Sequence, residues 1–161
     1  MKSIVFAALI SIGVNAFAQQ PGTQAPAISG QTIDGMPMRL QDLKGKIVLL
    51  DFWESKCKPC KEKFSFLNKL QERLKFRGFR VLAINVDDDP ENMYAFLKKQ
   101  AQPAKFPIVS DSRNGVPEDY LVQDMPTAVL IDKSGVIRYR QTGFDEAEKE
   151  KLVSEIAALL K

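Results

Sequence analysis

The only two cysteines of the chain, Cys57 and Cys60, stand at the junction between an apolar strand and a helix. Residues 47–53 form a short, continuous apolar run that is typical of a buried β-strand. From Pro59 onward, apolar residues recur at helical spacing until Gly78, a residue that favours a helix end. Both thiols therefore fall in or beside the first turn of an amphipathic helix.

This placement favours redox chemistry at the cysteine pair. Unpaired backbone N–H groups and the helix dipole favour a thiolate, which is the attacking species in disulfide exchange. Side chains three residues apart on a helix lie roughly 5–6 Å apart at Cβ, whereas a disulfide needs about 3.5–4.5 Å, so a bridge is reachable with some strain. Strained or exposed disulfides exchange readily, and the spacing therefore predicts a pair that cycles.

Two other uses of the cysteine pair are less well supported. A static bridge would close so small a loop that it would constrain little of the unfolded chain. A structural zinc site needs four ligands, and the chain has no histidine and no third cysteine. We therefore expect no metal, and we expect no cofactor.

The stretch Phe52-Trp53-x-x-x-Cys57-x-Pro59-Cys60 resembles the active site of the thioredoxin superfamily. Its surroundings resemble the TlpA/ResA-like extracytoplasmic thioredoxins, because the lead-in motifs of that family precede it in the same order. These motifs are Gly22-x-x-x-Pro26, Asp34-Gly35 and Leu40-x-x-Leu43-x-Gly45-Lys46. Downstream, residues 125–132 resemble the segment that carries the family's cis-proline.

The resemblance implies an α/β protein with a thioredoxin fold, in which a central mixed β-sheet is flanked by helices and preceded by an N-terminal β-hairpin extension. It also implies a thiol:disulfide oxidoreductase, which we expect to act as a reductase rather than as an oxidase. Four residues near the cysteines are implied to bind substrate, and the peptide bond between the last two is implied to be cis. They are Trp53, Pro59, Met125 and Pro126.

Three residues are the candidate catalytic groups. Cys57, nearer the helix start, is expected to attack a substrate disulfide, and Cys60 then resolves the mixed disulfide. Asp51 aligns with the thioredoxin aspartate, at a position where TlpA-like proteins often have asparagine. If it is buried, its carboxyl has a raised pKa and can accept the proton of Cys60 near neutral pH. The alternative is a frayed strand with Asp51 in water.

Lysines surround the cysteine pair. Lys56 and Lys58 flank Cys57, and Lys63 lies one helical turn beyond Cys60. Cations at these positions favour the thiolate, unless they are solvated surface charges whose effect salt screens. Two of these lysines depart from the family pattern: Lys56 stands where Trp is common, and Lys63 stands where ResA-like members carry Glu.

The N-terminal sequence predicts the compartment. A short basic start precedes an apolar stretch at residues 4–14 and a small-x-small pattern at residues 16–18, so residues 1–18 are interpreted as a cleaved signal peptide. An uncleaved anchor is the alternative. We expect a periplasmic or otherwise extracytoplasmic protein in which residues 19–161 form one thioredoxin-like domain. A reductase in an oxidising compartment needs an electron donor, which we expect to be membrane-bound.

Charge and composition limit the partners. The formal net charge is +3 for 161 residues, and no basic stripe with interleaved aromatics is present, so we expect no nucleic-acid partner. We expect a monomer that exchanges disulfides with thiol- or disulfide-containing substrate proteins.

Two alternative functions remain open. One is a peroxiredoxin-like thiol peroxidase, although Leu50 and Glu54 stand where the motif of that family has Pro and Thr or Ser. The other is a non-catalytic thioredoxin-fold binding module with a static disulfide.

The remaining chain alternates between strands and helices. We expect strands at residues 79–86, 106–109, 127–132 and 136–140, a helix from Pro90 to about residue 100 that is capped by Asp89, and a helical turn or loop at residues 117–122. A last helix is capped by Asp145, with Glu148 three residues on, and carries a wide apolar stripe. We expect this helix to pack on the sheet face opposite the helix that begins at Pro59.

Overall fold

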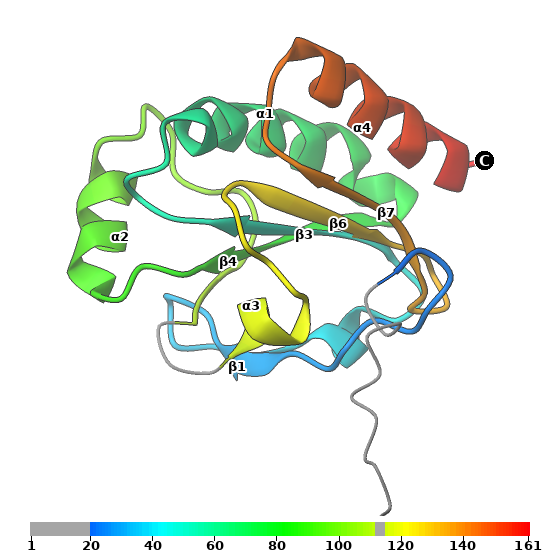
Figure 1. The fold of residues 1–161 in the computed structure, drawn as a ribbon, viewed down its shortest axis with the longest axis horizontal. Helices are drawn as coiled ribbons and strands as arrows, with labels where there is room; N and C mark the ends of the chain where they lie inside the picture. Colours follow the sequence, from blue (N-terminus) through cyan, green and yellow to red (C-terminus); the bar gives the residue numbers. More distant parts are fainter. Residues whose placement is uncertain (1–19, 112–114) are drawn as a thin grey trace, which may run out of the picture.

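A computed structural model describes residues 20–111 and 115–161, and the predicted signal peptide at residues 1–18 lies outside them. A five-stranded mixed sheet forms the centre, in the order β5-β4-β3-β6-β7 (Figure 1). β3 (Ile47–Trp53) is the middle strand; it runs parallel to β4 (Phe79–Asn85) and antiparallel to β6 (Thr127–Ile131). The predicted central mixed sheet is confirmed.

The edges of the sheet are formed by two shorter pairings. β5 (Ile108–Ser110) runs parallel to β4, and β7 (Ile137–Thr142) runs antiparallel to β6. β1 (Ser29–Gln31) and β2 (Pro37–Arg39) form the predicted N-terminal hairpin as a separate two-stranded sheet. The short 3-10 helix η1 (Leu40–Leu43) links β2 to the residues before β3.

Helices begin and end where the sequence carries capping signals. α1 (Lys58–Leu74) has Cys57 as N-cap and continues into the 3-10 turn η2 (Lys75–Arg77), which ends at the left-handed Gly78. α2 (Pro90–Lys98) starts after Asp89, whose side chain accepts a hydrogen bond from the backbone of Glu91. α3 (Val116–Asp119) is a single short turn, and α4 (Glu146–Leu159) begins with the predicted capping box.

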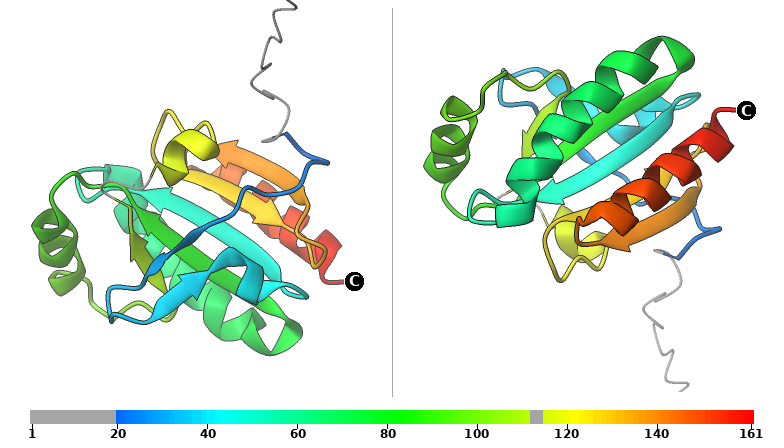
Figure 2. Two further views of the ribbon diagram at one scale, coloured as in Figure 1. Left: turned by 90° about the horizontal axis from the view of Figure 1, so that it is seen from below. Right: turned by 90° about the horizontal axis from the view of Figure 1, so that it is seen from above.

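The position of α4 corrects one prediction. α4 lies on the same face of the sheet as α1, as two views of the ribbon show (Figures 1 and 2). Leu152 and Ile156 of α4 belong to the same buried cluster as Leu67 of α1 and Leu49 and Leu130 of the sheet. The opposite face is already covered by the N-terminal segment and α3, through a second cluster of buried residues. That cluster includes Ile28, Leu40, Val48, Leu50, Phe52, Val116 and Tyr120.

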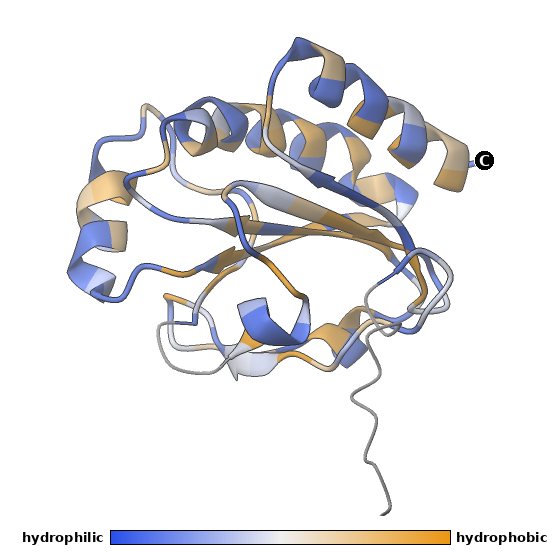
Figure 3. Cartoon of the chain, in the orientation of Figure 1, coloured by the Kyte–Doolittle hydropathy of each residue, from blue (hydrophilic) through white to orange (hydrophobic). Residues whose placement is uncertain are grey.

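The sheet separates two apolar layers, and α1 and α4 alternate between polar and apolar residues along their length (Figure 3). β3 is buried along its whole length, and its residues point alternately to the two layers. Within residues 20–111 and 115–161, no helix combines the length and apolarity needed to span a bilayer.

Candidate active site

Cys57 and Cys60 form a disulfide at the start of α1, with 5.3 Å between their Cα atoms. Cys57 is the N-cap residue, and Pro59 stands in the first turn, where its missing N–H leaves no helical hydrogen bond unmade. The backbone N–H of Cys60 donates to Sγ of Cys57 across 3.2 Å. This contact and the helix N-terminus favour negative charge on the sulfur of Cys57.

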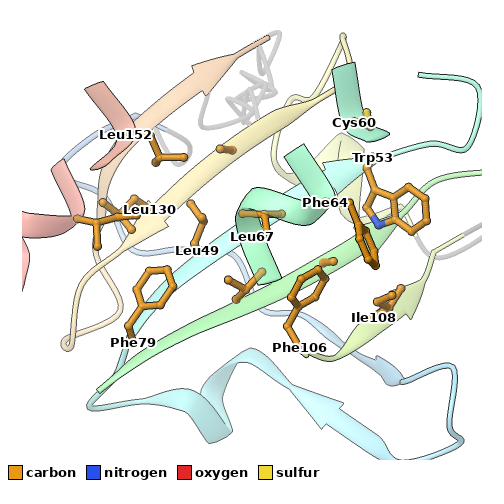
Figure 4. Packing of buried hydrophobic residues seen from close by; sticks show 14 of the residues in the cluster. Leu49, Trp53, Cys60, Phe64, Leu67, Phe79, Phe106, Ile108, Leu130 and Leu152 are labelled. Carbon is orange, nitrogen blue, oxygen red and sulfur yellow. The ribbon is translucent and has the colours of Figure 1, made fainter. Parts of the chain in front are cut away.

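The two sulfur-bearing residues differ in access to solvent. Cys57 is 9% exposed and Cys60 is 4% exposed, so the N-cap cysteine is the more accessible of the two. Both belong to the buried apolar cluster between α1 and the sheet, and Figure 4 shows Cys60 at the rim of that cluster. This order of exposure agrees with the predicted order of attack, which itself stays a prediction.

A side chain that sequence reasoning missed holds the turn before the cysteines. The carboxylate of Asp87 accepts hydrogen bonds from the backbone N–H of Ser55, at 3.0 and 3.2 Å, and from its hydroxyl at 2.7 Å. Nδ2 of Asn85 donates to the same carboxylate at 2.8 Å. Asp87 is therefore a buried anchor between the end of β4 and the loop that leads into Cys57. Within the described residues, no group of three or more acidic or cysteine side chains is arranged as metal ligands would be.

Asp51 lies on β3 and points into the layer that contains α1. Its residue exposure is 4%, so the predicted burial is confirmed. Burial raises the pKa of the Asp51 carboxyl above its usual value, and the charge of Lys63 and its hydrogen bond oppose that rise. The Asp51 carboxyl therefore binds a proton more tightly than an exposed aspartate does.

Lys63 is the main finding that the sequence did not predict. It is fully buried on α1, and its Nζ lies 2.6 Å from Oδ1 of Asp51. The alternative of a solvated surface charge is therefore wrong for Lys63, which pairs with the carboxylate of Asp51, whereas its effect on the thiols stays a prediction. Nζ also lies 5.8 Å from the ring centroid of Phe144, close enough for a cation–π contact. Apart from each other, Nζ and Oδ1 have no hydrogen-bond partner among the described residues.

Trp53 lies beneath the cysteine pair within an aromatic cluster. It is 2% exposed, and its ring packs against Phe96 at 4.9 Å and Phe64 at 6.4 Å between centroids (Figure 4). This packing fixes the end of β3 against α1 and α2. The predicted contact of Trp53 with substrate stays a prediction.

Met125 and Pro126 lie at the start of β6, beside the end of β3 that leads into the cysteines. The peptide bond between them is cis. Thr127, the next residue, pairs with Phe52 of β3, and the carbonyl of Pro126 accepts a hydrogen bond from Gly143 at 2.8 Å. Met125 is half-buried and packs against both apolar layers, while Pro126 is buried.

These features define a class of protein. A Cys-x-x-Cys disulfide at a helix start, with a buried carboxylate on the central strand and a cis-proline before the next strand of a five-stranded mixed sheet, is the arrangement of a thioredoxin-fold thiol:disulfide oxidoreductase. The comparisons with known proteins agree with this class.

The profile of the AhpC/TSA family matches residues 21–140, and the chain belongs to this family. Among curated relatives, the thiol-disulfide oxidoreductase ResA of Bacillus cereus is 34% identical over 133 residues, which cover 83% of this chain and 75% of the relative. ResA of Bacillus subtilis is 33% identical over 122 residues, which cover 76% of this chain and 67% of the relative.

Solved structures show the same likeness. A Chlorobium tepidum protein described as a thiol:disulfide interchange protein DsbE superposes with a TM-score of 0.83 at 36% identity, covering 88% of this chain and 99% of that one. The thioredoxin domain of a thiol-disulfide oxidoreductase from Bacteroides vulgatus gives a TM-score of 0.71 at 29% identity, covering 83% and 98% of the two chains. The thioredoxin fold and the thiol:disulfide oxidoreductase activity that the sequence predicted are thus confirmed.

Proposed function

We propose that the protein is an exported thiol:disulfide reductase that transfers two electrons to disulfides in substrate proteins. One observation carries the disulfide-exchange chemistry of this proposal: the disulfide of Cys57 and Cys60 lies at the first turn of α1, one helical turn from the buried pair of Asp51 and Lys63. The relatives named as thiol-disulfide oxidoreductases support the same chemistry.

In the first half of the reaction, reduced Cys57 acts as the nucleophile. Its thiolate attacks one sulfur of a substrate disulfide, forming a mixed disulfide and releasing the other substrate sulfur, which takes up a proton. The N–H of Cys60 and the start of α1 stabilise the attacking thiolate. Pro59, Met125 and Pro126, together with Trp53, are the residues against which we propose that the substrate lies.

In the second half, Cys60 releases the substrate. It attacks Sγ of Cys57, so the protein disulfide forms while the mixed disulfide breaks and the second substrate thiol leaves reduced. We propose that Asp51 accepts the proton of Cys60 in this step. Its carboxylate points toward α1 from β3, and its raised pKa makes it a better proton acceptor near neutral pH than an exposed aspartate.

The proposed location and partners follow from the need for a continuing supply of electrons. After each turnover the disulfide must be reduced again, and for an exported protein we propose a membrane-bound electron donor. Residues 1–18 are proposed to be a cleaved signal peptide, leaving residues 19–161 as one monomeric domain. Mass spectrometry of protein secreted by a host should find a mature chain that begins at Gln19, and an intact Met1 on membrane-bound protein would contradict this.

Reduction of insulin tests the proposed activity. Wild-type protein should accelerate the reduction of insulin by dithiothreitol, and Cys57→Ser should abolish the acceleration, because the attacking sulfur is lost. Equilibration with glutathione buffers of graded composition would then give the reduction potential, which decides between reductase and oxidase. If the protein is active but its reduction potential is as oxidising as that of a protein that donates disulfides, the proposed role as a reductase is wrong.

The thiol peroxidase remains a second candidate because the matching family profile is that of AhpC/TSA proteins. Leu50, where the peroxidase motif has Pro, is fully buried in the layer on the opposite face of the sheet from α1. Its side chain therefore cannot help to bind a peroxide at Cys57. Consumption of hydrogen peroxide by the reduced protein at a rate above that of insulin reduction would favour the peroxidase, and inactivity in both assays would favour a binding module.

A further inference from the structure

Basic side chains gather at the end of the molecule farthest along β3 from the cysteine pair. The parallel strands β3 and β4 both start here, and Ile47 donates its N–H to the carbonyl of Gly78. Gly45 likewise donates to the carbonyl of Lys133 in the turn between β6 and β7. The C-terminus of α4 reaches the same end of the molecule as the C-terminus of α1 (Figure 2), and Arg77 and Lys161 both line the groove between these helices. The exposed cations of this surface, called the basic end below, are Lys44, Lys46, Lys75, Arg77, Lys133 and Lys161.

The charge of the basic end is largely uncompensated. Within the described residues, none of its six cations forms an ion pair. The acidic side chains in the adjoining turns are already paired, Asp132 with Arg138 at 2.6 Å and Asp42 with Arg39 at 2.8 Å. Six exposed cations that form no ion pair among the described residues therefore share this surface, with Glu72 one helical turn before Lys75 as a neighbouring carboxylate.

Phe76 adds an apolar contact at the centre of this charge. Its side chain is 90% exposed on the turn η2, between Lys75 and Arg77. Nζ of Lys75 lies 5.0 Å from its ring centroid. The residue lines neither the groove of about 770 Å³ between α1 and α4 nor the hollow of about 150 Å³ beside Lys44. An exposed aromatic on a basic turn, outside both hollows, fits an interfacial membrane contact better than a concave protein site.

The segment of residues 22–25 also lies at the basic end. Gly22 donates its N–H to the carbonyl of Ile137, and Ala25 donates to the carbonyl of Gly135, so this segment runs beside the turn that carries Lys133. The cysteine pair lies at the other end of β3 (Figure 1).

We propose that the basic end binds the surface of an anionic phospholipid bilayer. The six cations would lie over the lipid headgroups, and Phe76 would enter the interfacial layer. Because the cysteine pair is at the opposite end of the sheet, the bound protein holds its disulfide toward the aqueous compartment and its substrates. This binding goes beyond the proposed redox function and does not depend on it.

Sedimentation with vesicles tests the proposal. The chain from Gln19 onward is suitable because every described helix, strand and core residue lies after that position. It should bind vesicles of phosphatidylcholine with about 30% phosphatidylglycerol, bind pure phosphatidylcholine weakly, and dissociate in about 0.5 M salt. Lys75→Ala with Arg77→Ala should lower the partition coefficient about 25-fold, which is about fivefold for each lost cation. Phe76→Ser should also weaken binding.

A matched control removes the same charge elsewhere. Lys98 and Lys99 are exposed on α2 and its C-cap, far from the basic end, and their double alanine variant should bind within about twofold of wild type. Insulin reduction should be unchanged in both double variants, which separates lipid binding from catalysis. Equal binding to anionic and neutral vesicles, equal losses in the two double variants, or no vesicle binding would overturn the proposal. In the last case the basic end would be a site for an acidic protein.

Discussion

Nζ of Lys63 lies 2.6 Å from Oδ1 of Asp51 in a layer from which solvent is almost excluded, with the two residues 0% and 4% exposed. The pair joins α1 to β3 one helical turn below the cysteines. Two opposite charges in such surroundings stabilise each other, but each is costly to bury alone. The pair therefore sets the charge state of the carboxylate that we propose to accept the proton of Cys60.

Replacing Lys63 by methionine should reveal the cost of the unpaired carboxylate. Lys63→Met removes the cation that opposes the burial effect, so the pKa of Asp51 should rise further. The free energy of unfolding at neutral pH should fall by about 3–5 kcal/mol, because a buried charge loses its partner. Urea unfolding between pH 5 and 8 measures this loss, and Lys69→Met, which alters an exposed lysine on the same helix, is the matched control.

The pH dependence of that loss gives a sharper test. A carboxyl whose folded-state pKa is raised stabilises the fold most when it is protonated, and it loses that contribution as the pH rises through the folded-state pKa. In Lys63→Met, the decrease in the free energy of unfolding with rising pH should extend to higher pH than in the wild type. Adding Asp51→Asn to Lys63→Met should recover stability at neutral pH and remove this part of the pH dependence. Parallel pH profiles for the single and double variants would show that Asp51 does not carry the effect.

The burial of Asp51 could be predicted because it interrupts a continuous apolar strand. The burial of Lys63 was missed, although positions 60, 63, 64 and 67 share one helical face and are all buried. A lysine is almost never fully buried unless it is paired, and the pairing depends on a contact between α1 and β3 that helical periodicity does not reveal. The helical periodicity thus indicates which face of α1 is buried, but it does not show that Lys63 on this face pairs with Asp51.

The position of α4 and the contact between Asp87 and Ser55 were not predicted, for similar reasons. An amphipathic stripe shows that α4 buries one side, but both faces of this sheet are apolar, so the stripe does not show which face it covers. Asp89 was recognised as an N-cap because its partner is two residues away. Asp87 bonds to Ser55, which is 32 residues distant in the sequence, so no local pattern indicates that contact.

Asp87 should contribute more to the free energy of unfolding than its neighbour Asp88. Asp87→Asn replaces the carboxylate that accepts hydrogen bonds from the N–H and hydroxyl of Ser55, leaving these partly buried donors poorly satisfied. The free energy of unfolding should fall by about 1–3 kcal/mol. Asp88→Asn changes an exposed carboxylate beside it and should stay within about 0.5 kcal/mol of wild type. Equal effects of the two substitutions in thermal and urea unfolding would remove Asp87 as the anchor of this loop.

The order of attack by the two cysteines can be trapped chemically. Cys60→Ser leaves Cys57 without its resolving partner, so mixed disulfides with substrate should accumulate through Cys57. Cys57→Ser should accumulate few, because Cys60 is the more buried sulfur. In the reduced wild type, iodoacetamide should label Cys57 first at neutral pH, and peptide mapping identifies the site. Faster labelling of Cys60 would reverse the roles assigned to the pair.

The last prediction concerns the proton acceptor itself. Asp51→Asn alone would leave Lys63 buried without a counter-charge, so the proposed role is best tested in Asp51→Asn with Lys63→Met, compared against Lys63→Met. Both proteins lack the lysine, and they differ only in the carboxyl. Release of substrate from a preformed mixed disulfide through Cys57 should be about 100-fold slower in the double variant near neutral pH, in the range expected when a general base is lost.

The formation of the mixed disulfide provides an internal control for this comparison. That step depends on Cys57 and not on Asp51, so its rate should be the same in the two variants. In Lys63→Met, the release rate should rise with pH as Asp51 ionises, through a pKa raised above the usual aspartate value, whereas the double variant should lack that rise. Equal release rates and equal pH profiles would exclude Asp51 as the acceptor, and the proton of Cys60 would then pass directly to water.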